Sequence, residues 1–326
     1  MLSSASITIS QPAVSPWTFN DKMKGCIYGL FVADAVATPY EFRSEDYMNK
    51  LSAIDMIPPQ GHHRTYKDVK TGTWSDEGSM TLAMMDTIVH CHGFKPKYFL
   101  RNLMQYKYEG AFCVNQYAFG YSRHLEQMLR AHKEGTPVYS LDEAKKSRDT
   151  DSLVRSVPLV LMDVNCSAKQ TIELAHKQAL VTNMHPITGI CSAIYMQWIK
   201  NIVRKENNPF VKSVHQLFEL YNAELRQMII LEILQHKPVV GVNDIAECLM
   251  DTYEIICKTS TYHEAVIEAV RKGNHSTSLA SSVGAIAGLI YGYRAIPQKW
   301  LDGLRSREMI DELVNEYVKE IKDEEK

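Results

Sequence analysis

Two adjacent carboxylates, Asp76 and Glu77, stand at the expected start of a helix in the run Trp74-Ser75-Asp76-Glu77-Gly78. Ser75 is a favourable N-cap, and acidic residues in a first turn interact well with the helix dipole, so a purely structural role accounts for the pair. The pair also lies between an aromatic loop and an apolar helix. This position favours carboxylates at the edge of a core, where they can bind a cation or polarise a water molecule.

Two further carboxylates lie near the end of an earlier helix. Asp34 occurs inside the apolar run 30–36, and a buried ionised carboxylate is unfavourable unless it is paired, hydrogen-bonded or bound to a metal. We therefore expect Asp34 either to accept backbone hydrogen bonds or to face a ligand. Glu41 follows Pro39 and Tyr40 just beyond this helix. Taken alone, Glu41 is a typical surface residue.

A small polar loop, residues 273–280, opens a late helix and contains Asn274 and His275. Loops of this kind direct backbone N–H groups toward anions. The helix behind the loop carries small residues at intervals of four, namely Ala280, Gly284, Gly288 and Gly292. Such a row allows another helix to approach closely. The pattern predicts a buried helix whose first turn is held firmly by the core.

The histidine pairs do not have the spacing of a zinc site. His62-His63 and His90-Cys91-His92 are neighbours in sequence, which do not converge on one ion as residues i and i+4 of a helix do. The chain also has no P-loop, no dinucleotide-binding fingerprint and no G-x-S-x-G motif. These common kinds of site therefore do not account for the acidic segments.

The composition is that of a globular protein. Hydrophobic residues make up 45% of the 326 residues and charged residues 23%, and the formal net charge of −2 gives no reason to expect a nucleic-acid partner. The seven cysteines form no CxxC pair, which favours reduced thiols and an intracellular, cytoplasmic setting. No apolar run reaches the length of about 18 residues that a membrane span needs, so no membrane partner is expected.

Helical periodicity dominates, and it predicts an all-α fold: a compact, single-domain orthogonal helical bundle over residues 20–326, preceded by a flexible N-terminal arm at 1–19. The only hint of a strand is the segment 6–10. The expected helices cover about residues 20–38, 76–90, 96–106, 121–132, 152–163, 168–179, 186–204, 211–235, 242–252, 261–272, 278–293 and 298–320.

Several segments, taken together and in order, resemble the ADP-ribosylglycohydrolase family, which includes the dinitrogenase reductase-activating glycohydrolases. The resemblance extends over about residues 23–300. The matching segments are 25–35 for the opening helix with its G-D-A motif, Glu41 for the acidic residue after it, 74–78 for W-T-D-D-T, 155–159 for M-R-x-x-P-L, 182–186 for T-H-x-x-P, 284–288 for G-A-I-A-G, and Ile296-Pro297 with Trp300 for I-P-x-x-W.

The resemblance implies an all-α fold that binds two Mg²⁺ ions and hydrolyses the glycosidic bond between ADP-ribose and a protein side chain or small acceptor. ADP-ribose or an ADP-ribosylated protein is then the expected partner. By position in the motifs, Glu41, Asp76 and Glu77 are the expected catalytic residues. The expected metal ligands are Ser75, Asp76, Glu77, Thr277 and Ser278, and the expected ligand-binding residues are Asp34, Asp151, His185, Asn274 and His275.

The chain departs from the family motifs at the second half of the metal site. The family reads G-G-D-x-D-T before the small-residue helix, and ungapped alignment places His275 and Thr277 at the two Asp positions. Each lost carboxylate removes a negative charge beside a divalent ion, which at an effective dielectric constant of ~20 is worth several kcal/mol before desolvation. Two tightly bound Mg²⁺ ions are therefore not expected. Either one ion on Glu41, Ser75 and Asp76, or a softer metal at His275, remains open.

Other departures are smaller. Ala33 replaces a Gly of the opening motif, Asn183 replaces a His, and Gly78 replaces a Thr. The G-N-G loop of the family aligns with residues 149–151, where Asp149 or Asp151 offers a replacement carboxylate.

Three functional hypotheses follow from these matches and departures. The first is a metal-assisted ADP-ribosylglycohydrolase-like hydrolase with an altered metal site. The second is a pseudoenzyme that binds ADP-ribose or a protein partner without hydrolysis. The third is a structural or assembly protein that keeps only the fold.

Overall fold

The computed structural model describes residues 19–324 except 138–139, 236 and 238–242. No strand occurs among these residues, so the all-α prediction is confirmed. The predicted arm lies outside the described residues except for Phe19, which is the first residue of a helix, and so does the possible strand at 6–10.

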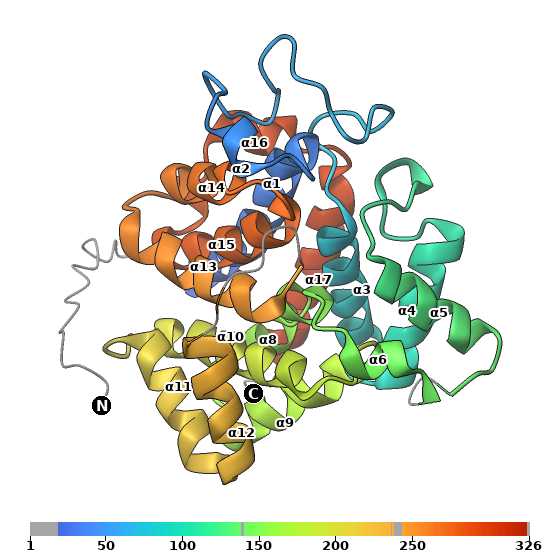
Figure 1. Cartoon of the computed structure of the whole chain (residues 1–326), viewed down its shortest axis with the longest axis vertical. Helices are drawn as coiled ribbons and strands as arrows, with labels where there is room; N and C mark the ends of the chain where they lie inside the picture. The colour runs from blue at the N-terminus through green and yellow to red at the C-terminus, as the bar shows by residue number, and fades with distance from the viewer. Residues whose placement is uncertain (1–18, 138–139, 236, 238–242, 325–326) are drawn as a thin grey trace.

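Most helices follow one another with short connections, whereas residues 49–75 form one long connection without a helix (Figure 1). Their bounds are α1 Phe19–Ala37, η1 Thr38–Tyr40, α2 Glu45–Met48, α3 Asp76–Cys91, α4 Pro96–Glu109, η2 Val114–Gln116, α5 Arg123–Lys133, α6 Asp142–Lys146, α7 Asp151–Val154, α8 Val157–Met162, α9 Ala168–Ala179, α10 Pro186–Val203, α11 Pro209–Leu220, α12 Ala223–Met228, the π-helix η4 Ile229–Leu234, α13 Ile245–Lys258, α14 Tyr262–Arg271, α15 Ser276–Tyr291, η5 Tyr293–Ala295, α16 Gln298–Gly303 and α17 Arg307–Glu324.

The helices α1 and α15 are packed against each other along their length, and glycines make this possible. A Cβ placed on Gly288 would lie 1.9 Å from the backbone oxygen of Gly25, and one on Gly284 would lie 2.4 Å from the oxygen of Gly29. The close approach predicted from the small-residue row therefore occurs, and α1 is the partner. Both helices are almost wholly buried, which makes them the centre of the molecule.

The remaining helices surround this central pair. In Figure 1, α13, α14 and α16 lie on the same side as α1 and α15, whereas α4, α5 and α6 lie beyond α3 on the opposite side. α10 packs against α9, α11 and α13 and completes the core below. The ends of α1, α3 and α15 are thereby brought together near the middle of the molecule.

Some predicted helices are interrupted. The expected helix 152–163 is divided into α7 and α8, because Pro158 at the start of α8 favours a new first turn. The expected helix 211–235 ends at Leu220, and Asn222 caps the next helix by accepting a hydrogen bond from the backbone N–H of Leu225. The expected helix 298–320 is broken at Ser306, which has a left-handed φ of 45°.

None of the described helices combines the length and the apolar character needed to cross a membrane.

Candidate active site

Asp34 attaches the first turn of α3 to α1. Its Oδ2 atom accepts hydrogen bonds from the backbone N–H groups of Ser75 at 3.0 Å and Gly78 at 2.9 Å. Complete burial raises the pKa of Asp34 to about 7, although these donors act in the opposite direction. The expectation that Asp34 accepts backbone hydrogen bonds is therefore confirmed. Contact between Asp34 and a ligand stays a prediction.

The first turn of α3 places Asp76 and Glu77 in the interior. Ser75 is the N-cap and accepts a hydrogen bond of 3.4 Å from the backbone N–H of Glu77. The two acidic residues are only 6% and 1% exposed. Burial raises the pKa of both carboxyl groups well above their usual range. Repulsion from Asp34 and Glu41 adds to the shift of Asp76, and repulsion from Asp76 and Asp34 adds to that of Glu77. Carboxyl groups with raised pKa values hold a proton at higher pH than exposed ones do, and such groups are common at functional sites.

Glu77 is hydrogen-bonded to the first turn of α15. Oγ of Ser278 donates to Oε1 of Glu77 at 2.5 Å, and the Thr150 hydroxyl donates to the same Ser278 oxygen at 3.0 Å. Oε2 of Glu77 is buried and has no hydrogen-bond partner among the described residues. One carboxylate oxygen of Glu77 is therefore held by the protein, and the other remains an acceptor for a ligand or water.

Glu41 is also held by the start of α15. Its Oε2 atom accepts hydrogen bonds from Oγ of Ser276 at 2.9 Å and from the backbone N–H of Thr277 at 2.8 Å. Nδ1 of His275 lies 4.0 Å from the other oxygen, Oε1. Glu41 is 4% exposed, and burial raises its pKa to about 7. Far from being a surface residue, Glu41 is a buried carboxyl group beside a helix N-terminus.

The loop before α7 supplies a further pair of carboxylates. Asp149 accepts a hydrogen bond of 2.9 Å from Nδ2 of Asn243, which also donates to the Thr150 hydroxyl at 2.9 Å. Asp151 is 2% exposed, and its Oδ2 atom has no hydrogen-bond partner among the described residues. Burial raises the pKa of Asp151 well above its usual range, and repulsion from Asp149 adds to this. The acidic surroundings of Asp76 and Glu77 therefore extend to this loop.

Arg155 is a buried cation that interacts electrostatically with Asp151 and Glu77. Its guanidinium donates to Oε1 and the backbone oxygen of Gln178 and to the Thr182 hydroxyl, each at 3.0 Å. Burial lowers its pKa to about 10, while the attraction of Asp151 and Glu77 opposes that shift. Arg155 remains charged at neutral pH and offsets part of the negative charge of the site.

Aromatic side chains from two segments lie beside the carboxylates. Tyr66 contacts Phe119 edge to face at 4.9 Å between ring centroids, and Tyr117 stacks on Phe119 at 6.0 Å. Burial raises the pKa of the Tyr66 hydroxyl, and the charges of Glu41 and Asp76 add to the shift. Tyr117 is 57% exposed. These rings provide an apolar surface next to an anionic site.

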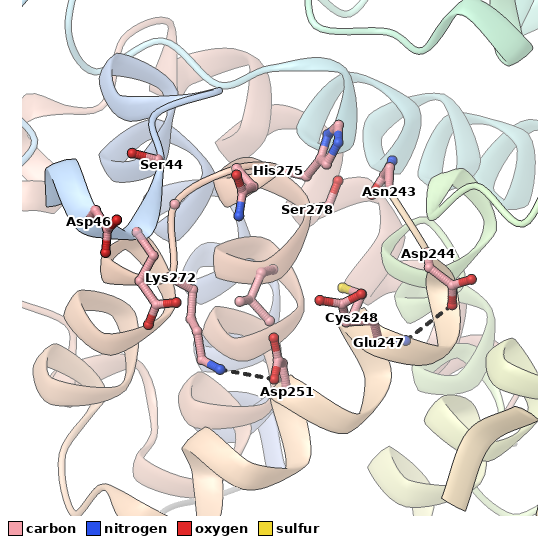
Figure 2. A pocket seen from close by; sticks show the side chains of 14 residues that line it. Ser44, Asp46, Asn243, Asp244, Glu247, Cys248, Asp251, Lys272, His275 and Ser278 are labelled. Atoms are coloured by element: carbon pink, nitrogen blue, oxygen red, sulfur yellow. Dashed lines mark hydrogen bonds and ion pairs between the residues drawn. The ribbon is translucent and has the colours of Figure 1, made fainter. Parts of the chain in front are cut away.

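An acidic cleft of about 490 Å³ reaches the first turn of α15, where Ser278 lines it and donates to Glu77, although the carboxylates Glu41, Asp76 and Glu77 do not line it themselves. Figure 2 shows His275, Ser278 and Asn243 at one end of this cleft, with Asp251 and Lys272 toward the other. Nζ of Lys272 forms an ion pair of 3.2 Å with Asp251. The acidic residues that line the cleft are Glu45, Asp46, Asp244, Glu247 and Asp251, and among the described residues Lys272 is the one Lys or Arg in the lining.

The structure brings together all but one of the residues expected from the sequence. Asn274 exchanges backbone hydrogen bonds with Phe42 and Arg43, which fixes the loop before α15 against the segment that follows Glu41. His185 is the exception. It caps α10, and its charged neighbours are Arg148, Glu232 and Asp244. Among the described residues, no contact between His185 and Glu41, Asp76 or Glu77 supports its predicted role in ligand binding.

Two residues that contribute hydrogen bonds to the site were not predicted from the sequence. Ser276 donates to Glu41, and Asn243 donates to Asp149 and Thr150. Asn243 immediately precedes Asp244, the N-cap of α13. An ion pair of 2.6 Å between Nε of Arg148 and Oδ2 of Asp244 connects the start of α13 to the loop before α7. Nothing in the local pattern around Asn243 signals a contact with residues about ninety positions earlier.

The residues at the expected metal positions do not fit a magnesium site. Mg²⁺ requires oxygen ligands in near-octahedral geometry at about 2.1 Å. Here two of the expected ligands, Glu77 and Ser278, bind each other, and Oε2 of Glu41 already accepts two hydrogen bonds. Among the described residues there is no group of three or more His, Cys, Asp or Glu side chains that could hold a metal ion.

Comparisons with known proteins give a family model and related proteins. A family model described as ADP-ribosylglycohydrolase matches residues 15–326. The chain is 26% identical, over 91% of its length and 78% of the relative's, to "ADP-ribosylarginine hydrolase Tri1" of Serratia proteamaculans. It is 23% identical, over 91% and 77%, to the protein of the same name in Pseudomonas putida.

A solved structure shares the fold. The match is titled "ADP-ribosylglycohydrolase-related protein complex" and has a TM-score of 0.72, covering 93% of this chain and 99% of that one. At 20% sequence identity, this likeness concerns the fold alone.

Proposed function

The chain belongs to the ADP-ribosylglycohydrolase family, and from this premise we propose that it hydrolyses the glycosidic bond between ADP-ribose and a protein side chain, with arginine as the favoured acceptor. The observation that carries the proposal is the convergence of Glu41 and the adjacent pair Asp76 and Glu77, from two separate segments, on one buried site. An acidic cleft opens beside them.

The carboxyl groups have the properties that such hydrolysis requires. Cleavage at the anomeric carbon passes through an oxocarbenium-like state, which neighbouring negative charge stabilises. One carboxyl group must also accept a proton from the attacking water, and one must donate a proton to the leaving group. Burial raises the pKa of Glu41 to about 7, which suits proton exchange at neutral pH. We assign proton transfer to Glu41. We assign stabilisation of the developing positive charge to Asp76 and Glu77, whose ionised forms a neighbouring positive charge favours over the protonated forms.

The charge of the cleft supports a cationic acceptor. Its lining carries five acidic residues against one lysine; Lys272 is paired with Asp251 and Arg148 with Asp244, so the lining keeps an excess of negative charge. A guanidinium group, or a basic peptide that contains it, would be attracted to such a surface, whereas an acidic peptide would be repelled. The name shared by two relatives, ADP-ribosylarginine hydrolase, points in the same direction.

The test is release of ADP-ribose from defined substrates. Purified protein is incubated with an arginine-linked and a serine-linked ADP-ribosylated protein, and free ADP-ribose is measured by chromatography. We expect release from the arginine-linked substrate, and its loss in Asp76→Asn. Asp302→Asn, an exposed change on α16, is the control and should leave the rate unchanged.

The release experiment, together with calorimetric measurement of ADP-ribose binding, separates the alternative functions. A wild-type protein that binds ADP-ribose in calorimetry but releases none from either substrate would be a pseudoenzyme. One that neither binds nor hydrolyses would keep only the fold.

A further inference from the structure

The first turn of α15 supplies hydrogen-bond donors to two of the three expected catalytic carboxylates. Ser276 and the backbone N–H of Thr277 donate to Oε2 of Glu41, and Ser278 donates to Oε1 of Glu77. α15 has 16 residues, and the N-terminus of such a helix carries a partial positive charge of about half a unit. The carboxylates therefore face the positive end of a helix.

This turn contains no carboxylate of its own. His275 and Thr277 stand where the family motif has aspartates, and Ser276, Thr277 and Ser278 are all buried. A divalent ion is retained where several anionic oxygens converge and lack other partners. Here one oxygen of Glu41 and one of Glu77 already accept hydrogen bonds from the protein. These donors stabilise the negative charge that would otherwise hold the ion.

We propose that this site binds its ligand without a divalent cation, and that the first turn of α15 takes the place of the ion. Ser276, Thr277 and Ser278 orient Glu41 and Glu77 so that one oxygen of each faces the ligand. Oε2 of Glu77 is buried without a partner among the described residues, and Oε1 of Glu41 lies 4.0 Å from Nδ1 of His275. These two oxygens are the acceptors for ligand hydroxyl groups. The inference rests on the proposed function only in taking ADP-ribose as that ligand.

The first measurement is binding of the metal itself. MgCl₂ is titrated calorimetrically into the full-length protein after dialysis against EDTA and then metal-free buffer, and thermal unfolding is recorded with and without millimolar Mg²⁺ or Mn²⁺. We expect no saturable binding below millimolar concentration and a melting temperature that changes by less than about one degree, because an ion that does not bind the folded state does not stabilise it. Micromolar binding of Mg²⁺ or Mn²⁺ to the wild-type protein would overturn the proposal.

The second measurement uses ADP-ribose. We expect the dissociation constant in EDTA and in 5 mM MgCl₂ to agree within twofold, and a loss of affinity of tenfold or more in EDTA would contradict the inference. If ADP-ribose binds under neither condition, the proposed function fails, and the metal titration alone still decides whether the site takes a divalent ion.

A variant that restores the acids gives the matched comparison. The double change His275→Asp and Thr277→Asp adds two carboxylates to the turn and should create Mg²⁺ binding, seen as a rise in melting temperature of several degrees on addition of MgCl₂. Should this variant not fold, Ser278→Ala serves instead. It should weaken ADP-ribose binding equally in EDTA and in MgCl₂, and a loss confined to MgCl₂ would show that the wild-type hydroxyl acts through a metal.

Discussion

Oγ of Ser278 lies 2.5 Å from Oε1 of Glu77, so a residue of the first turn of α15 holds a carboxylate of the first turn of α3 across 201 positions of sequence. Both side chains are buried, and Thr150 donates to the same serine oxygen. Three of the segments that form the site are thus connected through one hydroxyl group. Stability and site geometry are expected to change together when it is removed.

Ser278→Ala tests this connection. The change leaves Oε1 of Glu77 without its donor and the Thr150 hydroxyl without its acceptor, and a buried polar group left unpaired costs about 1–3 kcal/mol. We expect the free energy of unfolding, measured in urea, to fall by that amount. Ser52→Ala, at an exposed serine, is the control and should change it by less than about 0.5 kcal/mol. A loss at Ser278 no larger than the control's would show that the bond contributes little.

Asp34 makes stability depend on pH near neutrality. Its pKa is raised by burial to about 7 from the usual 3.8, so between these values the folded state binds more protons than the unfolded state. The free energy of unfolding therefore falls as the pH rises through 7, and for one such group the change from pH 6 to pH 8 is about 1.4 kcal/mol.

Asp34→Asn removes this titration and can keep an acceptor for the two backbone N–H groups. Urea unfolding of both proteins at pH 6 and pH 8 should show a smaller decrease in the variant, by about 1.4 kcal/mol. Equal pH dependence in the two proteins would mean that Asp34 stays ionised in the folded state throughout this range.

Gly288 sets the distance between the two central helices. An added Cβ would lie 1.9 Å from the Gly25 backbone oxygen, and neither backbone can yield without separating α1 from α15. Gly288→Ala should therefore cost more than about 3 kcal/mol or prevent folding. Gly303→Ala is the matched control, because its Cβ would meet only the flexible Met56 sulfur at 2.8 Å. Similar melting temperatures for the two variants would contradict this account of the packing.

Local sequence patterns predicted those parts of the fold that local forces determine. Ser75 was expected to cap a helix that begins at Asp76, and it does so. Small residues at intervals of four indicated a close helix contact, which α1 provides. The break at Ser306 left no such signal, because a serine takes up a left-handed conformation there and the apolar periodicity continues on both sides.

The site itself depends on contacts that no local pattern contains. The sequence identified Glu41 and Asp76 only because collinear motifs resembled a family, whereas each residue alone had an ordinary structural explanation. Asn243 shows the limit clearly, since its hydrogen bonds to Asp149 and Thr150 arise from how α13 is packed against the loop before α7. Such contacts become visible only in the folded chain.

The last prediction concerns the charge of the acidic cleft. Asp46→Lys reverses one charge on an exposed lining residue, and at low ionic strength the KM for an arginine-linked substrate should rise about three- to ten-fold with little change in kcat. The effect should shrink from 20 to 200 mM NaCl, because salt screens charges separated by more than about 10 Å. Asp302→Lys, outside the cleft, is the control. If the two variants had the same KM at both salt concentrations, the cleft would not be the surface that receives the cationic acceptor.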